Sequence, residues 1–325
     1  MLRLSPAAQA LLRYLHRVVR FAALLGVCFT FAGFLGRYNW FCELFIHFKS
    51  QLALCFIGYA ALEGLARHKQ FVLAALCCAF VNALPVIQLT LPTGSEPPSA
   101  DSPSTTLRIL QANILTSNTN APALLDLIAR ENPDVIVLQE TGIRWQHELA
   151  PLTNAYSLFA VKPREDNFGA AIYCKPAFSS AEILLLNDRE QAPSTRAQIT
   201  ANGKTLTVIG THPLMPYCKY TWVGRNAYTL DLARLLSETE GPRVVTGDFN
   251  NTPWAFHLKR FMAISGLRNS AQGRLPQPTW PSFLPAIARI PIDHCFHSPD
   301  VRIIDRRVGP GIGSDHMPLI IDIAF

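Results

Sequence analysis

Long apolar runs in the first third of the chain constrain its fold more than any other feature of the sequence. Residues 21–36 carry no charge, and the two valines just before Arg20 extend this run toward the N-terminus. Residues 71–91 form a second run of similar length with few polar positions. About 20 apolar residues are enough to cross the hydrocarbon core of a bilayer as a helix. We therefore predict transmembrane helices at about residues 18–36 and 71–91.

A third segment, at about residues 48–66, is a weaker candidate because Lys49 and Glu63 lie near its ends. Four arginines precede the first run, and three basic residues (67–69) separate this segment from the run that follows it. The positive-inside rule places both basic clusters in the cytoplasm, and only three spans satisfy both placements. We therefore predict a multi-pass anchor of three helices over residues 1–91, in the cell (inner) membrane, with the rest of the chain on the periplasmic, extracytoplasmic side.

Two other interpretations of this region fit less well. A cleavable signal peptide needs a small-residue cleavage site after the first run, and none precedes the next apolar segment. A buried helical hairpin of a soluble protein seldom contains runs this long and this free of charge. The membrane bilayer is therefore the one partner that the sequence indicates directly, and no protein partner can be inferred.

Residues 92–106 are rich in Pro, Ser and Thr, which predicts an extended linker between the anchor and the remaining chain. The chain as a whole is 49% hydrophobic and 16% charged, and the apolar excess lies in the anchor. Its net charge of +6 is spread out, without the concentrated basic stripe of a duplex-binding groove. Cysteines 174, 218 and 295 lack zinc-ligand spacing, so we expect free thiols.

From residue 107 to residue 325 the pattern changes to short strands that alternate with helices. The run DVIVLQ at 134–139 is typical of a strand buried on both faces. The dipeptide Asn-Gly at 202–203 predicts a hairpin turn. We expect the main helices at about 121–129, 143–156, 225–236 and 253–264. This mixture predicts an α/β fold in which two sheets pack face to face with helices outside.

Polar and ionisable residues gather where the predicted strands end. They are Asn113, Gln139, Glu140, His212, Asp248, Asn250, Asp293, Ser314, Asp315 and His316. Each one alone has an ordinary explanation as a helix cap or a turn residue. Their joint occurrence is hard to attribute to turns, because layered α/β proteins build their active sites at strand ends.

This ordered set resembles the endonuclease/exonuclease/phosphatase superfamily, with GDFN at 247–250 and SDH at 314–316 as the most specific segments. The resemblance covers residues 107–325. It implies a four-layered α/β/β/α sandwich of two mixed sheets, with the site in the cleft where the loops of the two sheets meet. It also implies a divalent metal, usually Mg²⁺, for which Mn²⁺ can substitute.

The resemblance also implies roles for the residues that match. Glu140 would be the principal metal ligand, with Asn113 and Asp315 nearby. Asp248 would orient or deprotonate the attacking water, and Asn250 would bind a phosphoryl oxygen. His316, oriented by the carboxylate of Asp293, would form a general acid/base pair. His212 stands where deoxyribonuclease and sphingomyelinase relatives have a second catalytic histidine.

The sequence also departs from the branches of this superfamily. Abasic-site endonucleases have an acidic residue where this chain has Leu115, and a tyrosine where it has His212, which argues against that branch. The carboxylate that partners the second histidine in deoxyribonuclease-type enzymes has no clear equivalent here. Arg196, Arg225 and Trp280 are further candidates for substrate contacts, although arginines at such positions are more often packing or surface residues.

The segment 276–291 (PQPTWPSFLPAIARIP) is apolar, aromatic and rich in proline. It fits either a loop packed over the edge of a sheet or an interfacial segment that dips toward a membrane.

From these observations we expect a membrane-anchored, divalent-metal-dependent phosphohydrolase. Because the tether keeps the domain near a bilayer, we favour a lipid or lipid-linked phosphoester as its substrate. Two alternatives stay open: an extracytoplasmic nuclease acting on DNA or RNA, and a non-catalytic membrane scaffold with the same fold. An anchor localises an enzyme without choosing its substrate.

Overall fold

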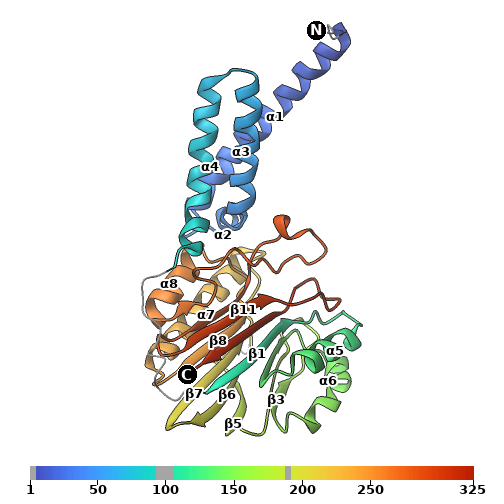
Figure 1. Ribbon diagram of the computed structural model, residues 1–325, viewed down its shortest axis with the longest axis vertical. Helices are drawn as coiled ribbons and strands as arrows, with labels where there is room; N and C mark the ends of the chain where they lie inside the picture. Colours follow the sequence, from blue (N-terminus) through green and yellow to red (C-terminus); the bar gives the residue numbers. More distant parts are fainter. Residues whose placement is uncertain (1–4, 93–104, 187–191) are drawn as a thin grey trace. The chain divides into compact units, whose positions relative to one another are not determined.

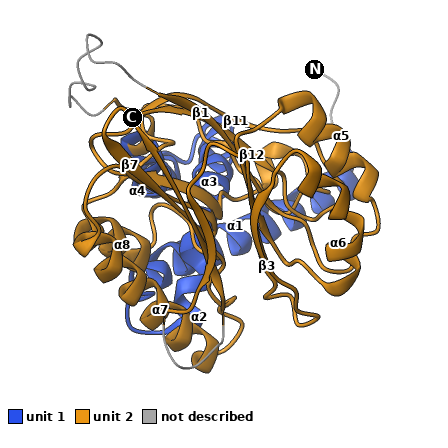
Figure 2. Cartoon of the chain, turned by 90° about the horizontal axis from the view of Figure 1, so that it is seen from below, with its two compact units in different colours: residues 1–88 blue, residues 89–325 orange. Residues whose placement is uncertain are grey.

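A computed structural model describes residues 5–92, 105–186 and 192–325 of the chain. These residues form two compact units, residues 1–88 and residues 89–325, which are coloured separately in Figure 2. We describe each unit by itself.

The first unit is helical (Figure 1). Its elements are α1 (Pro6–Phe34), α2 (Trp40–Glu43), the 3₁₀ helix η1 (Leu44–Phe48), α3 (Lys49–Leu65) and α4 (Lys69–Thr90). Three segments are long and apolar enough to cross a membrane: Pro6–Phe34, Trp40–Leu65 and Lys69–Thr90. The first helix begins well before the predicted span at 18–36, because residues 6–17 continue it as a more polar extension.

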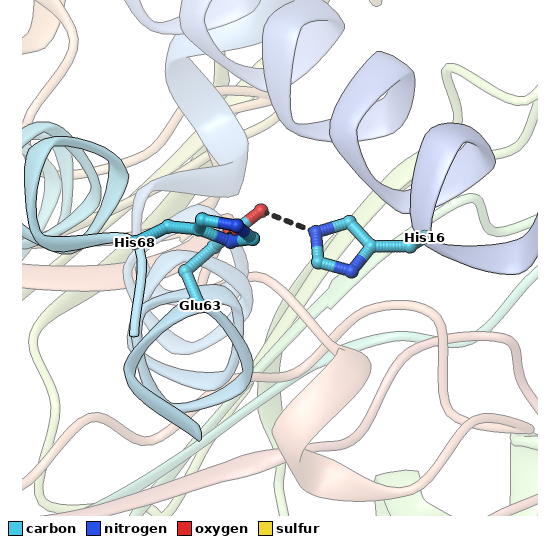
Figure 3. A group of neighbouring side chains, drawn as sticks. All are labelled: His16, Glu63 and His68. Atoms are coloured by element: carbon cyan, nitrogen blue, oxygen red, sulfur yellow. Dashed lines mark hydrogen bonds and ion pairs between the residues drawn. The ribbon is translucent and has the colours of Figure 1, made fainter. Parts of the chain in front are cut away.

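A buried ionic cluster explains how the second apolar segment carries Glu63. This side chain is fully buried and accepts hydrogen bonds from Arg20 Nε (2.8 Å) and Nη2 (3.0 Å) on α1. His16 and His68 also contact its carboxylate, at 2.9 and 2.7 Å (Figure 3). A lone buried carboxylate would be costly, and paired partners on another helix offset that cost. The cluster therefore ties α1 to the end of α3.

Lys49, at the start of α3, is buried in a second polar network. Its Nζ donates to Asn82 Oδ1 on α4 (3.1 Å), and Asn82 Nδ2 donates to Thr30 Oγ1 on α1 (2.9 Å). The two charges that make residues 48–66 a weak span in the sequence are thus both paired within the unit.

The second unit contains two six-stranded mixed sheets. The first has the order β11-β12-β1-β2-β4-β3, with strands Arg302–Val308, Leu319–Ala324, Thr106–Asn113, Val135–Gln139, Ala170–Cys174 and Leu158–Lys162. The second has the order β5-β6-β7-β8-β10-β9, with strands Ser180–Leu184, Ser194–Ala201, Lys204–Thr211, Arg243–Asp248, Asp293–His297 and Arg268–Asn269.

Alternating side chains build the layers. In β2, Val135 and Val137 belong to the core between the two sheets, whereas Ile136 and Leu138 pack with the helix α5 (Ala121–Glu131). The second sheet repeats this pattern beneath α7 (Lys219–Glu238) and α8 (Phe256–Ser265). In Figure 2, α5 and α6 (Ile143–Glu148) lie outside one sheet, and α7 and α8 lie outside the other. Because both faces of each sheet are covered, the central strand β2 (VIVLQ) is buried along its whole length. The predicted α/β/β/α sandwich is confirmed.

Each sheet contains one parallel pair of strands joined by a helix. β1 and β2 are connected through α5, and β7 and β8 through α7. The carboxyl ends of such pairs lie at one edge of a sheet, which is where α/β folds place ligands. Both pairs end at residues that the sequence marks as candidates: Asn113 and Gln139 in one, and Asp248 and His212, the residue after β7, in the other.

Three of the helices expected in this unit begin or end three or more residues away from the sequence expectation. The helix expected over 143–156 ends at Glu148 and continues as a 3₁₀ helix, Ala150–Asn154, because Pro151 cannot continue an α-helix. The helix expected from 225 begins at Lys219, where the backbone N–H of Cys218 donates to Thr221 Oγ1 as part of a capping box. The last expected helix begins at Phe256, after a turn through Pro253.

Candidate active site

The alternation that builds the inter-sheet core also delivers polar side chains to one end of it. Along β8, Val244 belongs to the inner core, and Asp248 stands four residues later on the same side. Along β10, Asp293 shares a face with the inner-core residue Cys295. Asp293 and Asp248 are direct partners in the antiparallel register. Two carboxylates therefore lie side by side at the end of the inter-sheet gap.

His316 lies between these two carboxylates. Its Nδ1 donates to Asp293 Oδ2 at 2.9 Å, and its Nε2 is 3.6 Å from Asp248 Oδ2. Asp293 is fully buried, and Gln111 Nε2 donates to its other oxygen at 3.0 Å. The carboxylate of Asp293 therefore fixes the orientation of the imidazole, as the sequence-based assignment of an Asp-His pair requires.

His212 approaches Asp248 from the end of β7. Its Nε2 is 3.5 Å from Asp248 Oδ2, and its ring packs against Phe168 with centroids 5.4 Å apart. Its buried Nδ1 has no hydrogen-bond partner among the residues that the structure describes.

The carboxylates control the protonation of both histidines. Burial by itself lowers the pKa of His316, but the charges of Asp293 and Asp248 outweigh it and raise the pKa to about 10. Burial likewise lowers the pKa of His212, and the hydrogen bond and charge of Asp248 more than compensate, so its pKa is raised. For Asp248, burial raises the pKa, whereas the histidines dominate and hold it below its usual value. Within this cluster the imidazolium form of His316 therefore persists through neutral pH.

Glu140 follows β2 in a left-handed backbone conformation (φ 62°), which turns it out of the strand. Its Oε1 accepts from Asn113 Nδ2 at 2.9 Å, and the same amide nitrogen lies 3.2 Å from Asp248 Oδ2. The Thr116 hydroxyl donates to the Glu140 carbonyl at 3.1 Å. Asn113 thus links the carboxylate of Glu140, which follows a strand of the first sheet, to that of Asp248, which ends a strand of the second.

Asp315 lies beside Trp280, whose Nε1 donates to Asp315 Oδ2 at 3.0 Å. Its Oδ1 is buried and has no hydrogen-bond partner within the described part of the chain. Together with Glu140, Asp248 and Asp293, it gives the site more carboxylates than its histidines neutralise. An excess of hard oxygen donors, one of them unpaired, fits a divalent cation such as Mg²⁺. Within the site, ligand atoms of Asp248, Asp293 and His316 all lie within 4.8 Å of one another.

Asn250 is held close to Asp248 by the backbone. Its N–H donates to Asp248 Oδ1 at 2.7 Å, and its side-chain Nδ2 donates to the carbonyl of Pro213 at 3.0 Å. Gly247, the residue before Asp248, allows β8 to lie close to β7, because a Cβ there would stand 1.9 Å from the Thr211 carbonyl oxygen. Two neighbouring strands thus approach closely enough to bring their terminal side chains together.

The three candidate substrate contacts differ in where the structure places them. Trp280 lies beside the cluster, with its ring centroid 6.5 Å from that of His316. Arg225 is buried and contacts the backbone next to the cluster, because its Nη1 donates to the carbonyl of Asn250 at 3.0 Å. Arg196 is not brought to the cluster: its guanidinium pairs with Glu182 on the neighbouring strand, at 2.6 Å. Arg225 therefore acts as a support for the 248–250 turn.

Gln111 is a residue that sequence reasoning missed. Its amide nitrogen contacts both Asp293 Oδ1 and Gln139 Oε1, at 3.0 and 2.8 Å, so it joins the two sheets behind the histidine. The signal was present, since Gln111 is a polar residue on the inward face of β1, two residues after the core residue Ile109. Such a residue needs a buried partner.

Residues 110–316 match the sequence model of the Endonuclease/Exonuclease/phosphatase family. The chain belongs to this family. A search of curated proteins found no match.

Solved structures share the fold at low sequence identity. TDP2 of D. rerio, complexed with single strand DNA product, is 19% identical, with a TM-score of 0.56, and the alignment covers 67% of this chain and 99% of that one. The human Nocturnin catalytic domain with bound sulfate anion is 19% identical, with a TM-score of 0.54 and coverage of 70% and 99%. An endonuclease/exonuclease/phosphatase from Bacteroides vulgatus is 18% identical, with a TM-score of 0.55 and coverage of 67% and 98%. The family match and these likenesses confirm the assignment made from the sequence.

Proposed function

We propose that this chain is a divalent-metal-dependent phosphoesterase that is held at a membrane by its N-terminal helices. The observation that carries the proposal is the buried set Asp248, His316 and Asp293, which faces the Glu140–Asn113 pair across the gap between the sheets. Members of this family are metal-dependent phosphodiesterases, nucleases or phosphatases. Each group that phosphoester hydrolysis requires has a residue of suitable chemistry here.

The side chains divide the work by their chemistry. A divalent cation held by Glu140, together with Asp315, would neutralise charge on the phosphoryl group. Asp248, whose lowered pKa keeps it ionised, is the group suited to orient the attacking water. The imidazolium of His316 is suited to stabilise charge on the phosphoryl or leaving oxygen and to donate its Nε2 proton. Asn250 offers an amide to a phosphoryl oxygen once it exchanges its contact with Pro213.

Hydrolysis of a generic phosphodiester and a generic phosphomonoester reporter by the purified full chain tests this activity. We expect Mg²⁺- or Mn²⁺-dependent turnover that falls at least about 100-fold in Asp248→Asn. The matched control is Asp231→Asn, an exposed aspartate on α7 paired with Arg234, which should leave turnover unchanged. A wild-type chain that cleaves neither reporter with either metal would favour a non-catalytic scaffold.

For the substrate, we propose a lipid or lipid-linked phosphoester. Three segments of the chain are suited to crossing a bilayer, which would keep the domain close to lipid. The segment 276–291, which lies next to the site, also exposes apolar side chains: Phe283 is 77% and Ile287 66% exposed. The Ser282 N–H donates to the Asp315 carbonyl at 2.7 Å, so this exposed segment is attached directly to a site residue. An apolar rim next to the site suits a substrate that sits in a membrane surface.

Two substrate panels separate the lipid hypothesis from the nuclease alternative. The lipid hypothesis expects release of a phosphorylated headgroup from phosphodiester lipids, or of phosphate from phosphomonoester lipids, in phospholipid or sphingolipid vesicles, with a loss of turnover in Phe283→Ser on vesicles but not on the soluble reporters. A nuclease would instead cleave single-stranded or duplex DNA or RNA with Mg²⁺, lose that activity in His316→Ala and leave the vesicles intact.

We further propose that the catalytic domain lies on the extracytoplasmic side of the cell membrane. The basic residues before α1 and between α3 and α4 support this orientation. A reporter enzyme that is active only outside the cytoplasm, fused after Phe325, should be active in intact cells. Activity of a cytoplasm-specific reporter at the same position would show the opposite orientation.

A further inference from the structure

A cavity of about 270 Å³ lies between α7 and α8, on the outer side of the second sheet. Its walls are partly apolar, with Val223, Leu230 and Phe261 among the lining residues. It is separate from the candidate active site, because none of its lining residues belongs to the Asp248–His316 cluster. Figure 1 shows the two helices next to each other on this side of the domain.

Three side chains that line this cavity have buried nitrogen atoms without a hydrogen-bond partner among the described residues. They are Trp222 Nε1, Asn226 Nδ2 and His257 Nε2. An unsatisfied buried polar group costs roughly 1–3 kcal/mol, so three such groups around one cavity need an explanation. The indole and amide nitrogens only donate hydrogen bonds, so a partner must offer acceptor oxygens.

The orientation of Asn226 is set by Arg225. The Arg225 Nε and Nη2 atoms donate to Asn226 Oδ1 at 3.1 and 2.9 Å. A guanidinium has no acceptor, so the amide oxygen must face it and Nδ2 must remain on the other side. Asn226 and Trp222 are also four residues apart on α7, which places them on the same face of the helix. The side chains that carry two of the three nitrogens therefore share one face of α7, and both line the cavity.

The charge of the cavity also favours an acceptor-rich ligand. Arg260, one turn after His257 on α8, lines the cavity and is exposed at its edge. Burial, with the charges of Arg225 and Arg260, lowers the pKa of His257 to about 4, so its imidazole is neutral at pH 7. A neutral imidazole is a weaker anion partner than an arginine but can still donate one hydrogen bond. Among the described residues that line the cavity, none is acidic and none would oppose a negative ligand.

We propose that the α7–α8 cavity is a binding site for a phosphate-type anion, recognised by Arg260, Trp222, Asn226 and His257. Two sources carry this chemistry: a small soluble phosphate and the headgroup of an anionic phospholipid. The apolar walls accommodate the carbon portion of either one. Arg225 links this cavity to the turn at 248–250. It donates to the side-chain oxygen of Asn226, which lines the cavity, and to the backbone carbonyl of Asn250.

Binding to the metal-free full chain in detergent tests the proposal, with EDTA present to prevent metal-assisted phosphate binding at the active site. Isothermal titration calorimetry with inorganic phosphate and with glycerol 3-phosphate covers the soluble source. Native mass spectrometry after incubation with phosphatidylglycerol or phosphatidylcholine covers the lipid source. We expect saturable binding in at least one arm, with phosphatidylglycerol retained in preference to phosphatidylcholine if the source is a lipid.

Two variants and one control assign the binding to the cavity. Arg260→Gln should weaken it at least about tenfold, and Trp222→Phe, which keeps the aromatic wall and removes the N–H, about three- to tenfold. Lys259→Gln removes the same charge from the neighbouring exposed position, which does not line the cavity, and should change affinity less than twofold. Absence of saturable binding in both arms would overturn the proposal. Equal weakening by Lys259→Gln and Arg260→Gln would also overturn it, because it would indicate general surface charge.

Discussion

Replacing Asp293 with asparagine tests the central electrostatic claim, namely that this carboxylate holds His316 as an oriented imidazolium. Asp293 contacts His316 Nδ1 at 2.9 Å and provides the largest of the effects that raise its pKa to about 10. One neighbouring opposite charge shifts a pKa by roughly 1–3 units, so in Asp293→Asn the pKa should fall to about 7–9. At 1.36 kcal/mol per unit, the imidazolium loses about 1.4–4 kcal/mol of stabilisation.

The same substitution should lower turnover by more than this loss of charge implies. Asparagine can donate to Nδ1 as well as accept from it, so it no longer selects the tautomer with its proton on Nδ1. General acid–base catalysis typically contributes about 10²–10⁴-fold, and we expect a loss of kcat in this range. NMR titration of the His316 ring in the metal-free protein measures the pKa, and kcat/KM between pH 6 and 10 measures its consequence.

A matched control is Asp300→Asn, at an exposed turn after β10, which should change neither quantity. The reasoning is refuted if Asp293→Asn folds normally and its His316 still titrates near pH 10, or if its turnover stays within about threefold of wild type. A folded variant with a lowered pKa and unchanged turnover would separate the electrostatics from the catalysis and would remove His316 from the acid–base role.

Three further outcomes are expected. In Glu140→Gln, Mg²⁺ and Mn²⁺ should no longer raise the melting temperature, and turnover should fall roughly 10²–10³-fold; unchanged metal stabilisation would place the ion elsewhere. Burial lowers the pKa of His294 to about 4, so its contribution to stability is complete above pH 6.5 and is lost as the pH falls toward 4, by about 3 kcal/mol at most. Melting at pH 7 and pH 5 should therefore differ less in His294→Gln than in wild type, and equal differences would contradict this. In detergent, Glu63→Gln should destabilise the helical unit by about 2–3 kcal/mol, because Arg20 and two histidines lose a buried anion, whereas the surface variant Glu182→Gln should cost at most about 1 kcal/mol. Equal melting temperatures for these two variants would refute a structural role for the cluster.

Much of the fold follows from local patterns in the sequence. The run DVIVLQ predicts a strand covered on both faces, and the structure covers it with the other sheet and with α5. Asn202-Gly203 predicts the β6–β7 hairpin, where both residues have positive φ. The errors occur where a single residue overrides a periodic pattern, as Pro151 does in the helix expected over 143–156. The two-residue strand β9 carries too little pattern to be predicted.

The site was predictable in its members but not in its geometry. Strand ends identify Asp248, Asp293 and His316 as candidates, since an ionisable residue after a buried run is unusual. No sequence pattern shows that Asp248 and Asp293 are cross-strand partners, because that register depends on long-range pairing of β8 with β10. For the same reason Arg196 was included among the candidates, although its partner Glu182 lies on an adjacent strand that the sequence does not pair with it.

The position of β12 has a consequence for the order in which the candidate site assembles. This strand lies between β11 and β1, and the segment Ser314–His316 immediately precedes it. A growing chain that has reached Asp293 but not His316 holds the carboxylates of Asp248 and Asp293 side by side, without the imidazolium of His316 that neutralises them. Its first sheet also lacks the inner strand β12. The site therefore assembles only after β12 has joined the first sheet and His316 has reached the two carboxylates.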